Sequence, residues 1–313
     1  MYLGELISLL VAFMWTFTAL FIEYASKKLG HLPVNFLRLV LAFLFTGLLL
    51  MVFSGHFLPQ AADAKTWFWM SISGLVGFVF GDFCLFYSYV VIGSRFGQLF
   101  MTLAPPAAAI AGFYILDEKM GWMGVLGMTV TLAGISISIL SRHKSEKGGR
   151  NHYRLKLPLK GVLLGIGAGV GQGVGLVLSK LGMQYYSLSA EGSSQEVIQM
   201  IPFAASQMRM VIASISLIII LMLTNKLKDI KPAFYNKKAA WSILLATFFG
   251  PFLGVAGSLM AVQYTASGIA STIMATTPIL ILIPAVFIQK QQVRTAEVFG
   301  AIISVVGVAL FFV

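Results

Sequence analysis

Long apolar stretches alternate with short polar connections along the whole chain. Ten stretches are each about 20 residues long, which matches the roughly 30 Å of hydrocarbon that a helix crosses at about 1.5 Å per residue. We expect all ten to be helices, because a backbone exposed to lipid has to satisfy its own hydrogen bonds. They lie at 3–22, 33–53, 67–90, 95–116, 120–140, 161–183, 202–224, 240–262, 268–289 and 295–313.

The pattern of these stretches occurs twice. An offset of 173 carries the segment from Ser94 to Gly134 onto the segment from Ser267 to Gly307, and an offset of 171 carries Arg38 onto Arg209. Further pairs at the first offset are Gly77 with Gly250, Gly81 with Gly254, Pro105 with Pro278 and Gly127 with Gly300. This predicts an internal duplication, with a first repeat at 1–140, a basic linker at 141–160 and a second repeat at 161–313.

Each repeat contains an odd number of predicted spans, five. The second repeat must then cross the membrane in the opposite sense to the first, which is an inverted-topology repeat. Two such halves can exchange roles and open a central site first to one side and then to the other. The sequence thus predicts an all-α membrane protein of ten transmembrane helices in two inverted five-helix repeats. The plainer interpretation is that duplication only enlarged a helix bundle.

Composition and charge agree with the membrane class. Hydrophobic residues make up 58% of the 313 residues and charged residues 11%, against roughly 45–50% and 25% in soluble domains. The net charge is +11, but the basic residues gather in the connections between apolar stretches, as the positive-inside rule describes. We therefore expect membrane lipid and no nucleic acid among the partners.

Lysine and arginine are distributed unequally between the two sides. The side of the termini carries three and the opposite side seventeen, while Arg38 and Arg209 lie inside spans. This count predicts a cytoplasmic loop at 141–160 and external termini. The connection at 184–201 contains no lysine or arginine. It is predicted to be an external loop, either a mobile polar segment or a lid.

Arg38 and Asp82 are ionisable residues inside predicted spans. Arg38 lies five residues into the second span and Asp82 eight residues from the end of the third, so both lie at similar depths below one face. An ion pair between them would fix how the two spans pack. Alternatively, Asp82 accepts a proton or a cation and couples its charge to opening of the cavity.

Arg209 repeats Arg38 without repeating its carboxylate, because Val255 stands at the position that corresponds to Asp82. Arg209 is expected either to pair with Glu5 or Glu118 or to receive a carboxylate or phosphate of the substrate. Together, Arg38, Asp82 and Arg209 are the predicted coupling or gating residues.

Prolines mark the candidate substrate cavity. Pro105 and Pro278 interrupt the fourth and ninth spans near their middles and predict helix kinks. The polar side chains near these kinks are expected to line the cavity: Gln98, Thr102, Thr276 and Thr277. Alternatively, the threonine hydroxyls only bond their own helices.

The sixth span combines a glycine ridge with one polar side chain. Its glycines, at 161, 165, 169 and 173 and again at 167, 171 and 175, let a neighbouring helix approach closely. Gln172 lies at its centre and corresponds to Trp15 of the first span at an offset of 157. The two side chains are predicted to form a pocket floor, and Trp15 as a core residue is the alternative.

The sequence contains no pattern that indicates catalysis. It has no HExxH motif, no Walker loop and no Cys/His spacing for a metal, and its single cysteine is Cys84. We predict no enzyme activity, no catalytic residue, no metal site and no cofactor. Coupling to protons or to a counter-substrate remains open, as does a homodimer.

The five-plus-five inverted repeat, the central proline in the fourth span of each repeat and the acidic hinge Asp117-Glu118 together resemble the drug/metabolite transporter superfamily, EamA-like family. The resemblance covers nearly the whole chain. It implies a secondary carrier of the inner (plasma) membrane, often an exporter of amino acids or other small metabolites. It also implies a cavity formed by the first, third and fourth spans of each repeat, here by Trp15, Asp82, Gln98 and Gln172.

Two features depart from the family pattern. The second repeat has Lys290-Gln291 where the first has Asp117-Glu118. Many relatives place both termini in the cytoplasm, which is contrary to the charge count given above.

The leading prediction is a secondary active transporter, an exporter of small polar or amphipathic metabolites such as amino acids, that works by alternating access. A drug or cation exporter of the same fold would rely on Asp82 and aromatic walls, and an anion carrier on Arg209. A polytopic protein without transport, such as a lipid-modifying enzyme, should cluster acids or histidines at one interface, and this sequence does not.

Overall fold

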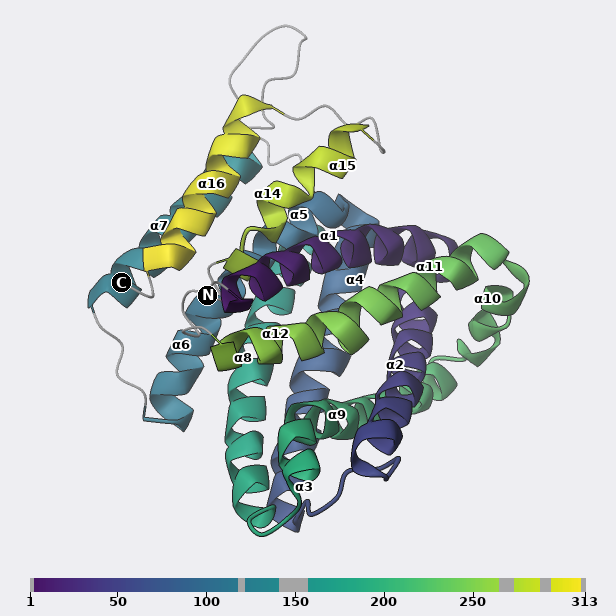
Figure 1. Cartoon of the computed structure of the whole chain (residues 1–313). Coiled ribbons are helices and arrows are strands. Elements are labelled where there is room, and N and C mark those ends of the chain that lie inside the picture. Colours follow the sequence, from purple (N-terminus) through teal and green to yellow (C-terminus); the bar gives the residue numbers. More distant parts are fainter. Residues whose placement is uncertain (1–2, 118–121, 141–156, 265–272, 288–293, 311–313) are drawn as a thin grey trace, which may run out of the picture.

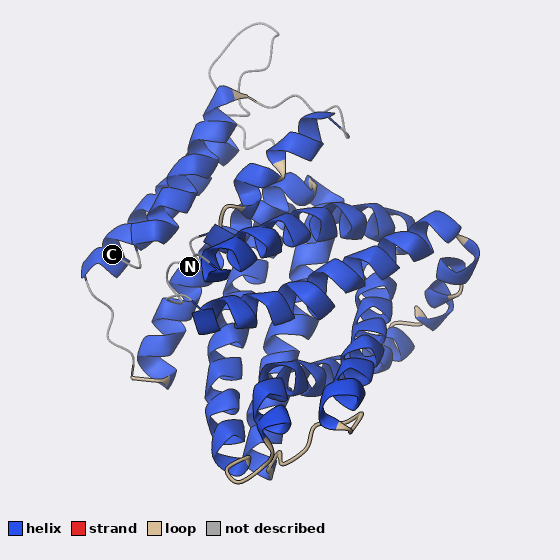
Figure 2. Cartoon of the chain, in the orientation of Figure 1, coloured by secondary structure: helices blue, strands red, loops and turns tan. Residues whose placement is uncertain are grey.

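A computed structural model of the protein describes residues 3–117, 122–140, 157–264, 273–287 and 294–310. All regular elements in these ranges are helices (Figure 2). Seven helical stretches are long and apolar enough to cross a membrane: Leu3–Leu29, His31–Ser54, Ala64–Ile92, Ser94–Ile115, Leu159–Ser189, Gln195–Leu223 and Lys237–Val255. Two shorter apolar helices lie at Trp122–Ser138 and Thr295–Leu310.

The N-terminal half contains α1 (Leu3–Leu29), α2 (His31–Ser54), α3 (Ala64–Gly74), the π-helical segment η1 (Leu75–Gly81), α4 (Asp82–Ile92), α5 (Ser94–Phe100), the 3-10 turn η2 (Met101–Leu103), α6 (Ala104–Ile115) and α7 (Trp122–Leu140). The C-terminal half contains α8 (Leu159–Ser189), α9 (Gln195–Leu223), η4 (Leu227–Ile230), α10 (Pro232–Tyr235), α11 (Lys237–Thr247), the π-helical segment η5 (Phe248–Phe252), α12 (Leu253–Tyr264), α14 (Thr277–Leu280), α15 (Leu282–Phe287) and α16 (Thr295–Leu310).

The prediction of an all-helical membrane protein is confirmed, whereas the number of ten spans stays a prediction. Both ends of the predicted ninth span, 268–272 and 288–289, lie outside the described residues, and the described part contains the short helices α14 and α15. The other nine predicted spans each coincide with a helix or a run of consecutive helical segments.

The prediction of a long loop at 184–201 is wrong. Helix α8 continues to Ser189 and α9 begins at Gln195, so only residues 190–194 connect them. No glycine or proline interrupts 184–189, and the Tyr186 hydroxyl donates to the backbone oxygen of Gln60 at 2.6 Å, which holds this extension against the rest of the molecule. The chain turns instead at Gly192, whose φ of 86° suits glycine.

The start of the third span is set by a local cap. Asp63 precedes α3, and its carboxylate accepts from the Thr66 amide at 2.8 Å and from the Thr66 hydroxyl at 2.6 Å. This satisfies a donor that the first turn of the helix leaves without a partner. The hydroxyl and amide hydrogen bonds from Thr66 hold the pKa of the Asp63 carboxyl below its usual range.

Corresponding helices of the two halves pack against each other in opposite directions. Helices α7 and α16 lie side by side (Figure 1). Gly307 of α16 contacts Thr131 of α7, whereas Gly300, earlier in α16, contacts Ser138, later in α7. A Cβ added to Gly307 would lie 2.4 Å from the amide nitrogen of Thr131, so the two backbones are in direct contact.

Helices α2 and α9 form the second antiparallel pair. Leu39 of α2 clusters with Met210 and later residues of α9, whereas Leu50 clusters with the earlier residues Ile201 to Met208. The Gln207 amide of α9 also donates to the backbone oxygen of Phe57, just beyond the end of α2, at 2.9 Å. The direction of α9 is thus opposite to that of α2.

Each half also inserts its first helix against the third span of the other half. Helix α8 packs along α3, η1 and α4, and α1 packs along α11, η5 and α12. The contacts of α8 pair Gly171 with Gly81 and Gly175 with Gly77. In the other interface, Trp15 contacts Gly254 and Thr18 contacts Gly250. The two interfaces use positions that correspond under the sequence offsets.

Both third spans change to π-helix at corresponding residues, since Leu75, where η1 begins, corresponds to Phe248, where η5 begins. A π-helical turn inside an α-helix is rare and is frequent at functional sites. The two halves therefore share this local irregularity as well as the helix order.

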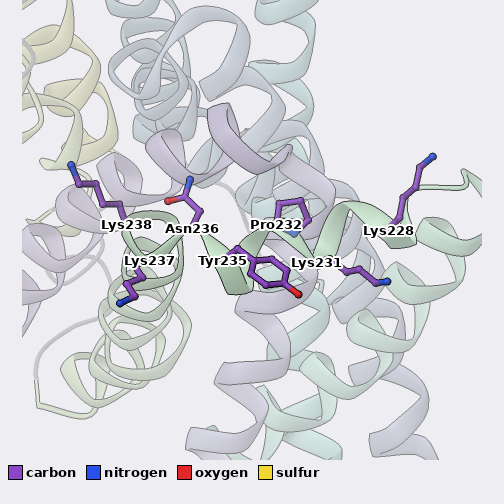
Figure 3. Close-up of a pocket in the computed structure, with 7 residues that line it drawn as sticks. All are labelled: Lys228, Lys231, Pro232, Tyr235, Asn236, Lys237 and Lys238. Carbon is purple, nitrogen blue, oxygen red and sulfur yellow. The ribbon is translucent and has the colours of Figure 1, made fainter.

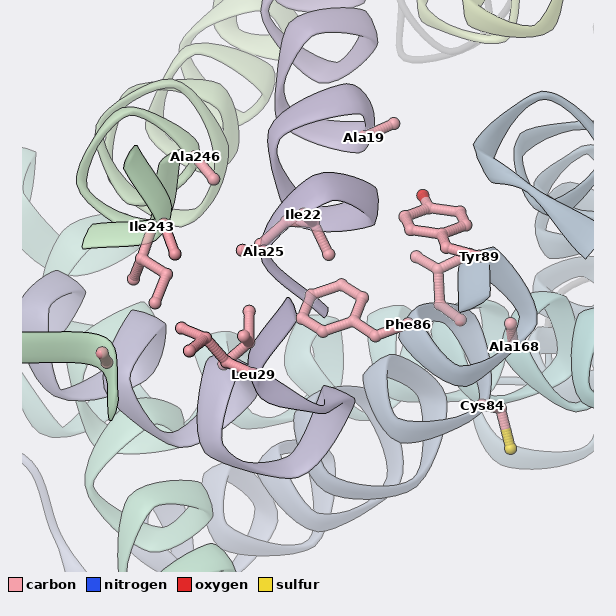
Figure 4. Close-up of a cluster of buried hydrophobic side chains, with 14 of the residues drawn as sticks. Ala19, Ile22, Ala25, Leu29, Cys84, Phe86, Tyr89, Ala168, Ile243 and Ala246 are labelled. Carbon is pink, nitrogen blue, oxygen red and sulfur yellow. The ribbon is translucent and has the colours of Figure 1, made fainter. Parts of the chain in front are cut away.

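Apolar side chains fill the space between α1, α4 and α11 (Figure 4). Ile22 and Leu29 of α1 cluster with Phe86 of α4 and Ile243 of α11. This cluster lies where α1 ends and α2 begins, which we call the lysine-rich end because it carries Lys27, Lys28, Lys160, Lys237 and Lys238. The molecule is closed between these three helices at that end.

Candidate functional site

A cluster of polar side chains surrounds Asp82, the first residue of α4. Arg38 of α2 donates to one carboxylate oxygen of Asp82 in a buried ion pair, and Gln172 of α8 donates to the other at 2.7 Å. Asn35 accepts from the Arg38 guanidinium at 3.1 Å. With Arg209 of α9, these residues form what we call the central polar cluster. Each carboxylate oxygen of Asp82 thus accepts one hydrogen bond from a side chain of another helix.

The π-helical segment η1 and the small residue Gly81 position this cluster. Asn35 donates to the backbone oxygen of Phe78 at 2.9 Å, and Gln172 donates to that of Gly77 at 3.3 Å. A Cβ at Gly81 would lie 3.3 Å from both the backbone nitrogen and the side-chain amide of Gln172. Side chains from α2 and α8 therefore bond to η1 carbonyls, and glycine lets α8 approach closely enough to do so.

Arg209 enters the cluster differently from Arg38. It is 9% exposed, its guanidinium lies 4.3 Å from the centre of the Phe78 ring, and it interacts electrostatically with Asp82. Its Nε is buried without a hydrogen-bond partner. In the described ranges, no carboxylate lies within ion-pair distance of it. The predicted pair with Glu5 is therefore not formed, and Glu118 lies outside the described residues.

The other predicted cavity residues have partners of their own. Gln98 donates to the Tyr89 hydroxyl at 2.8 Å. Three threonine hydroxyls, those of Thr102, Thr276 and Thr277, donate to carbonyls three residues earlier in their own segments. The Thr277 bond goes to the carbonyl of Met274, the same group that Pro278 leaves without an amide donor. These hydroxyls retain only lone pairs for a substrate.

The prolines lie where the helices change character. The chain adopts a 3-10 turn at Met101–Leu103, and Pro105 then lies in the first turn of α6. Pro278 likewise lies in the first turn of α14, and a break at Ile281 separates α14 from α15. A proline in a first helical turn removes no hydrogen bond that the turn would have formed.

Trp15 and Gln172 belong to different interfaces. Gln172 bonds to Asp82, whereas Trp15 of α1 packs on α12, where a Cβ at Gly254 would lie 2.7 Å from the indole nitrogen. Because Gly81 and Gly254 correspond in sequence, Trp15 and Gln172 are equivalent residues of two interfaces. The predicted floor formed by both is therefore replaced by two separate contacts.

Two cavities outside the central polar cluster are defined in the described structure. An open groove of about 810 Å³ lies on the connection between α9 and α11 (Figure 3). Its lining consists of Lys228, Lys231, Pro232, Tyr235, Asn236, Lys237 and Lys238. A second cavity of about 10 Å³ lies between Arg95, Pro278 and Glu297, which is room for about one water.

Sequence reasoning missed two polar contacts near the lysine-rich end. Arg95 of α5 lies 3.4 Å from the carboxylate of Glu297 in α16, and both side chains are buried. Glu23 of α1 bonds to Lys27 and accepts from the backbone and hydroxyl of Ser94. Glu297 is the single acid in the last predicted span, and that signal would have found the first contact.

Comparison with known proteins identifies the family. The model of the EamA-like transporter family matches residues 2–140 and, a second time, residues 159–313. The chain belongs to the EamA-like transporter family. This confirms the resemblance drawn from the repeats, makes the protein a multi-pass membrane transporter and indicates a transporter rather than an enzyme.

Curated relatives of this EamA-like protein are also transporters by name. The chain is 32% identical to "Uncharacterized transporter YetK" of Bacillus subtilis over 143 residues, which is 43% of this chain and 42% of the relative. It is 32% identical to "Uncharacterized inner membrane transporter YhbE" of Escherichia coli K12 over 108 residues, 33% of this chain and 32% of the relative. These matches span less than half of the relatives' length.

A solved crystal structure shares the fold. It superposes with a TM-score of 0.62 at 16% identity, over 98% of this chain and 95% of the other. At this level of identity the similarity concerns the arrangement of helices alone.

Proposed function

We propose that this EamA-like protein is a secondary active transporter that exports small polar or amphipathic metabolites, such as amino acids, across the inner membrane. Alternating access would result from two five-helix repeats of opposite orientation. The observation that carries the proposal is the antiparallel contact of corresponding helices, α2 with α9 and α7 with α16. Corresponding elements run in opposite directions in an inverted repeat and in the same direction when repeats are parallel.

The reciprocal interfaces supply two alternative arrangements. Helix α8 lies on the third span of the first half as α1 lies on that of the second. The contacts differ in detail, because the first interface has Gln172 and Gly175 where the second has Trp15 and Thr18. The two interfaces are therefore equivalent in place but not in side chains, and alternating access would exchange their geometries between two opposite states.

The described conformation is closed at the lysine-rich end. The apolar cluster between α1, α4 and α11 fills that end (Figure 4), and the contact between Arg95 and Glu297 links α5 to α16 across the halves. The charge count assigns the lysine-rich end to the cytoplasm. We therefore propose that this state is closed toward the cytoplasm.

The central polar cluster is the proposed coupling element. Asp82 faces Arg38 from α2, Gln172 from α8 and Arg209 from α9, so its charge state decides how much positive charge remains uncompensated among these spans. Protons or a counter-substrate would act through this balance. In the described conformation Asp82 is paired with Arg38, so a cationic substrate would have to displace or share this partner.

Cross-linking α5 to α16 at the lysine-rich end is expected to stop transport. The variant Arg95→Cys/Glu297→Cys, made in a Cys84→Ser background, places a thiol on each side of the contact between halves. The transported compound is a metabolite that stabilises the purified protein, and its flux is measured in proteoliposomes. A bifunctional thiol reagent that reduction can cleave should abolish this flux, and reduction should restore it.

The matched control keeps the reagent within one helix. A pair of cysteines at Leu176 and Lys180 of α8, one turn apart, should be modified without loss of flux. Flux that continues at full rate through the quantitatively cross-linked Arg95→Cys/Glu297→Cys protein would contradict alternating access at this contact.

The orientation is expected to follow the charge count. In Cys84→Ser cells, Glu191→Cys, in the connection between α8 and α9, should react with a membrane-impermeant maleimide. Lys238→Cys, at the lysine-rich end, should react only after permeabilisation; both replaced side chains are exposed. The reverse labelling pattern would place the lysine-rich end outside and invert the assignment of the closed face.

A further inference from the structure

We propose that Arg209 binds the carboxylate group of a monoanionic substrate. The proposal rests on the transport function above and narrows its substrates to small amphipathic carboxylates, which leaves out zwitterionic amino acids such as leucine. It begins with the correspondence of Arg38 and Arg209, which occupy equivalent places in the two halves.

Arg38 shows which kind of group an arginine binds at this position. It binds a carboxylate of its own chain, that of Asp82, and lies 4.8 Å from the ring centre of Phe86. Arg209 lies similarly, 4.3 Å from the ring centre of Phe78, but Val255 stands where a second aspartate would be. The second half thus repeats the arginine without the carboxylate, and the ring beside Arg209 comes from η1 of the first half.

The lack of a carboxylate partner for Arg209 is energetically unfavourable because this side chain is buried. Arg209 is 9% exposed, and its Nε has no hydrogen-bond partner. A guanidinium inside a membrane protein is unfavourable unless it is paired or bonded. Asp82 acts on Arg209 only electrostatically in the described structure, since its hydrogen bonds go to Arg38 and Gln172.

The charges of the cluster select a monoanion. Among the described residues, the cluster contains two guanidinium groups, Arg38 and Arg209, and one carboxylate, Asp82. One further carboxylate balances this set. A phosphate dianion would overcompensate it, and an ammonium group would add a charge of the sign already in excess.

The surroundings of Arg209 suit a flat anionic group with an apolar body. The Phe78 ring lies over the guanidinium, so planar bidentate bonding along the guanidinium edge is the mode that this contact favours. Gly77 has no side chain at this place, where a Cβ would lie 2.8 Å from a terminal nitrogen of Arg209. Glycine therefore keeps the space beside that nitrogen clear.

Four probes separate the head groups in a binding experiment on the purified full-length protein in nanodiscs. The first three share one apolar body: 4-methylpentanoate is a carboxylate, leucine is its zwitterionic 2-amino form, and 3-methylbutylamine is the corresponding cation. Inorganic phosphate, used at a pH high enough to make it a dianion, is the fourth. We expect 4-methylpentanoate to raise the unfolding temperature in a concentration-dependent manner and to do so more than each of the other three.

Variants of the two arginines supply the matched control. Arg209→Gln should abolish the response to 4-methylpentanoate, and Arg209→Lys should weaken apparent affinity by about tenfold, because lysine keeps the charge without the bidentate fork. Without ligand, Arg209→Gln should unfold at the same or a higher temperature than the wild type, since it loses the contact with the Phe78 ring but no ion pair, and it removes a buried charge. Arg38→Gln should unfold at a lower temperature, because it leaves Asp82 buried and unpaired.

Three results would overturn the assignment: no response of the wild type to 4-methylpentanoate, an equal response in Arg209→Gln, or a loss of ligand-free stability in Arg209→Gln as large as that in Arg38→Gln. An equal or greater response to leucine, the amine or phosphate would reject the monoanion class. Failure of the transport proposal can be distinguished from failure of the binding proposal. In the former case the cross-linked protein would still carry flux, while Arg209-dependent binding of 4-methylpentanoate would persist.

Discussion

Replacing Asp82 by asparagine is expected to lower the free energy of unfolding by about 3–5 kcal/mol, the range for breaking a buried ion pair from one side. Asp82 is 4% exposed and Arg38 6% exposed, so the arginine left behind cannot regain its charge balance from water. Transport should stop as well, because the central polar cluster then carries two positive charges and no negative one. Denaturant unfolding of the purified protein and flux in proteoliposomes measure the two effects.

A double variant separates stability from function. In Arg38→Met/Asp82→Leu both charges of the pair are replaced by apolar side chains of similar size, which is often neutral or stabilising. This variant should recover most of the lost unfolding free energy and remain inactive in transport. Asp82→Asn protein that unfolds like the wild type would show that the pair adds little to the fold.

Leucine at Gly175 is expected to prevent α8 from packing on the third span. A Cβ at this position would lie 2.9 Å from the Cα and 3.0 Å from the nitrogen of Gly77, and both are backbone atoms that cannot move aside independently. Overpacking of this kind costs about 1–3 kcal/mol or more. The hydrogen bonds of Ser73 to Gly175 at 2.7 Å and of Gln172 to Asp82 at 2.7 Å would be lost with the interface.

The measurement for Gly175→Leu is the yield of monodisperse protein and its unfolding temperature. Two changes on the same helix serve as controls. Val170→Leu adds bulk at a side chain that is 43% exposed and should be neutral. Gly167→Ala meets side chains rather than backbone, the Cys84 sulfur at 3.0 Å and the Phe80 ring at 3.5 Å, and should be tolerated because alanine also favours the helix by about 1 kcal/mol. Equal behaviour of all three variants would argue against backbone contact at Gly175.

The features of the fold that the sequence predicted correctly come mostly from patterns that repeat along the chain. Apolar stretches of membrane length located the helices, because lipid leaves the backbone no alternative to helical hydrogen bonding, although some helix ends lie up to seven residues from the predicted ones. The offset that matched Gly77 with Gly250 also matches the two π-helical segments and the reciprocal interfaces. The depths of Arg38 and Asp82 below one face anticipated that they lie near each other.

Residue contacts that depend on helix rotation were out of reach. Gln172 was predicted to face Trp15, yet it bonds to Asp82, and Trp15 packs on Gly254 in the equivalent interface. Arg95 is one of the seventeen basic residues that the sequence analysis counts on the side opposite the termini, yet its side chain is buried beside Glu297 of α16. The turn at 190–194 is short because a tertiary contact of Tyr186 holds the end of α8, and no local pattern announces such a contact.

By itself the sequence determined the membrane class, the positions of most helices and the duplication. It also placed Arg38, Asp82 and Arg209 inside apolar stretches. These properties follow from hydrophobicity, chain length and residue order, which act locally or through the bilayer. The tertiary structure decided which faces meet, and hence that Asp82 is held by Arg38 and Gln172 while Arg209 keeps no direct carboxylate in the described chain. The physical reason is that rotation of a helix about its axis is set by close contact with neighbouring helices, and lipid solvates every apolar face equally well.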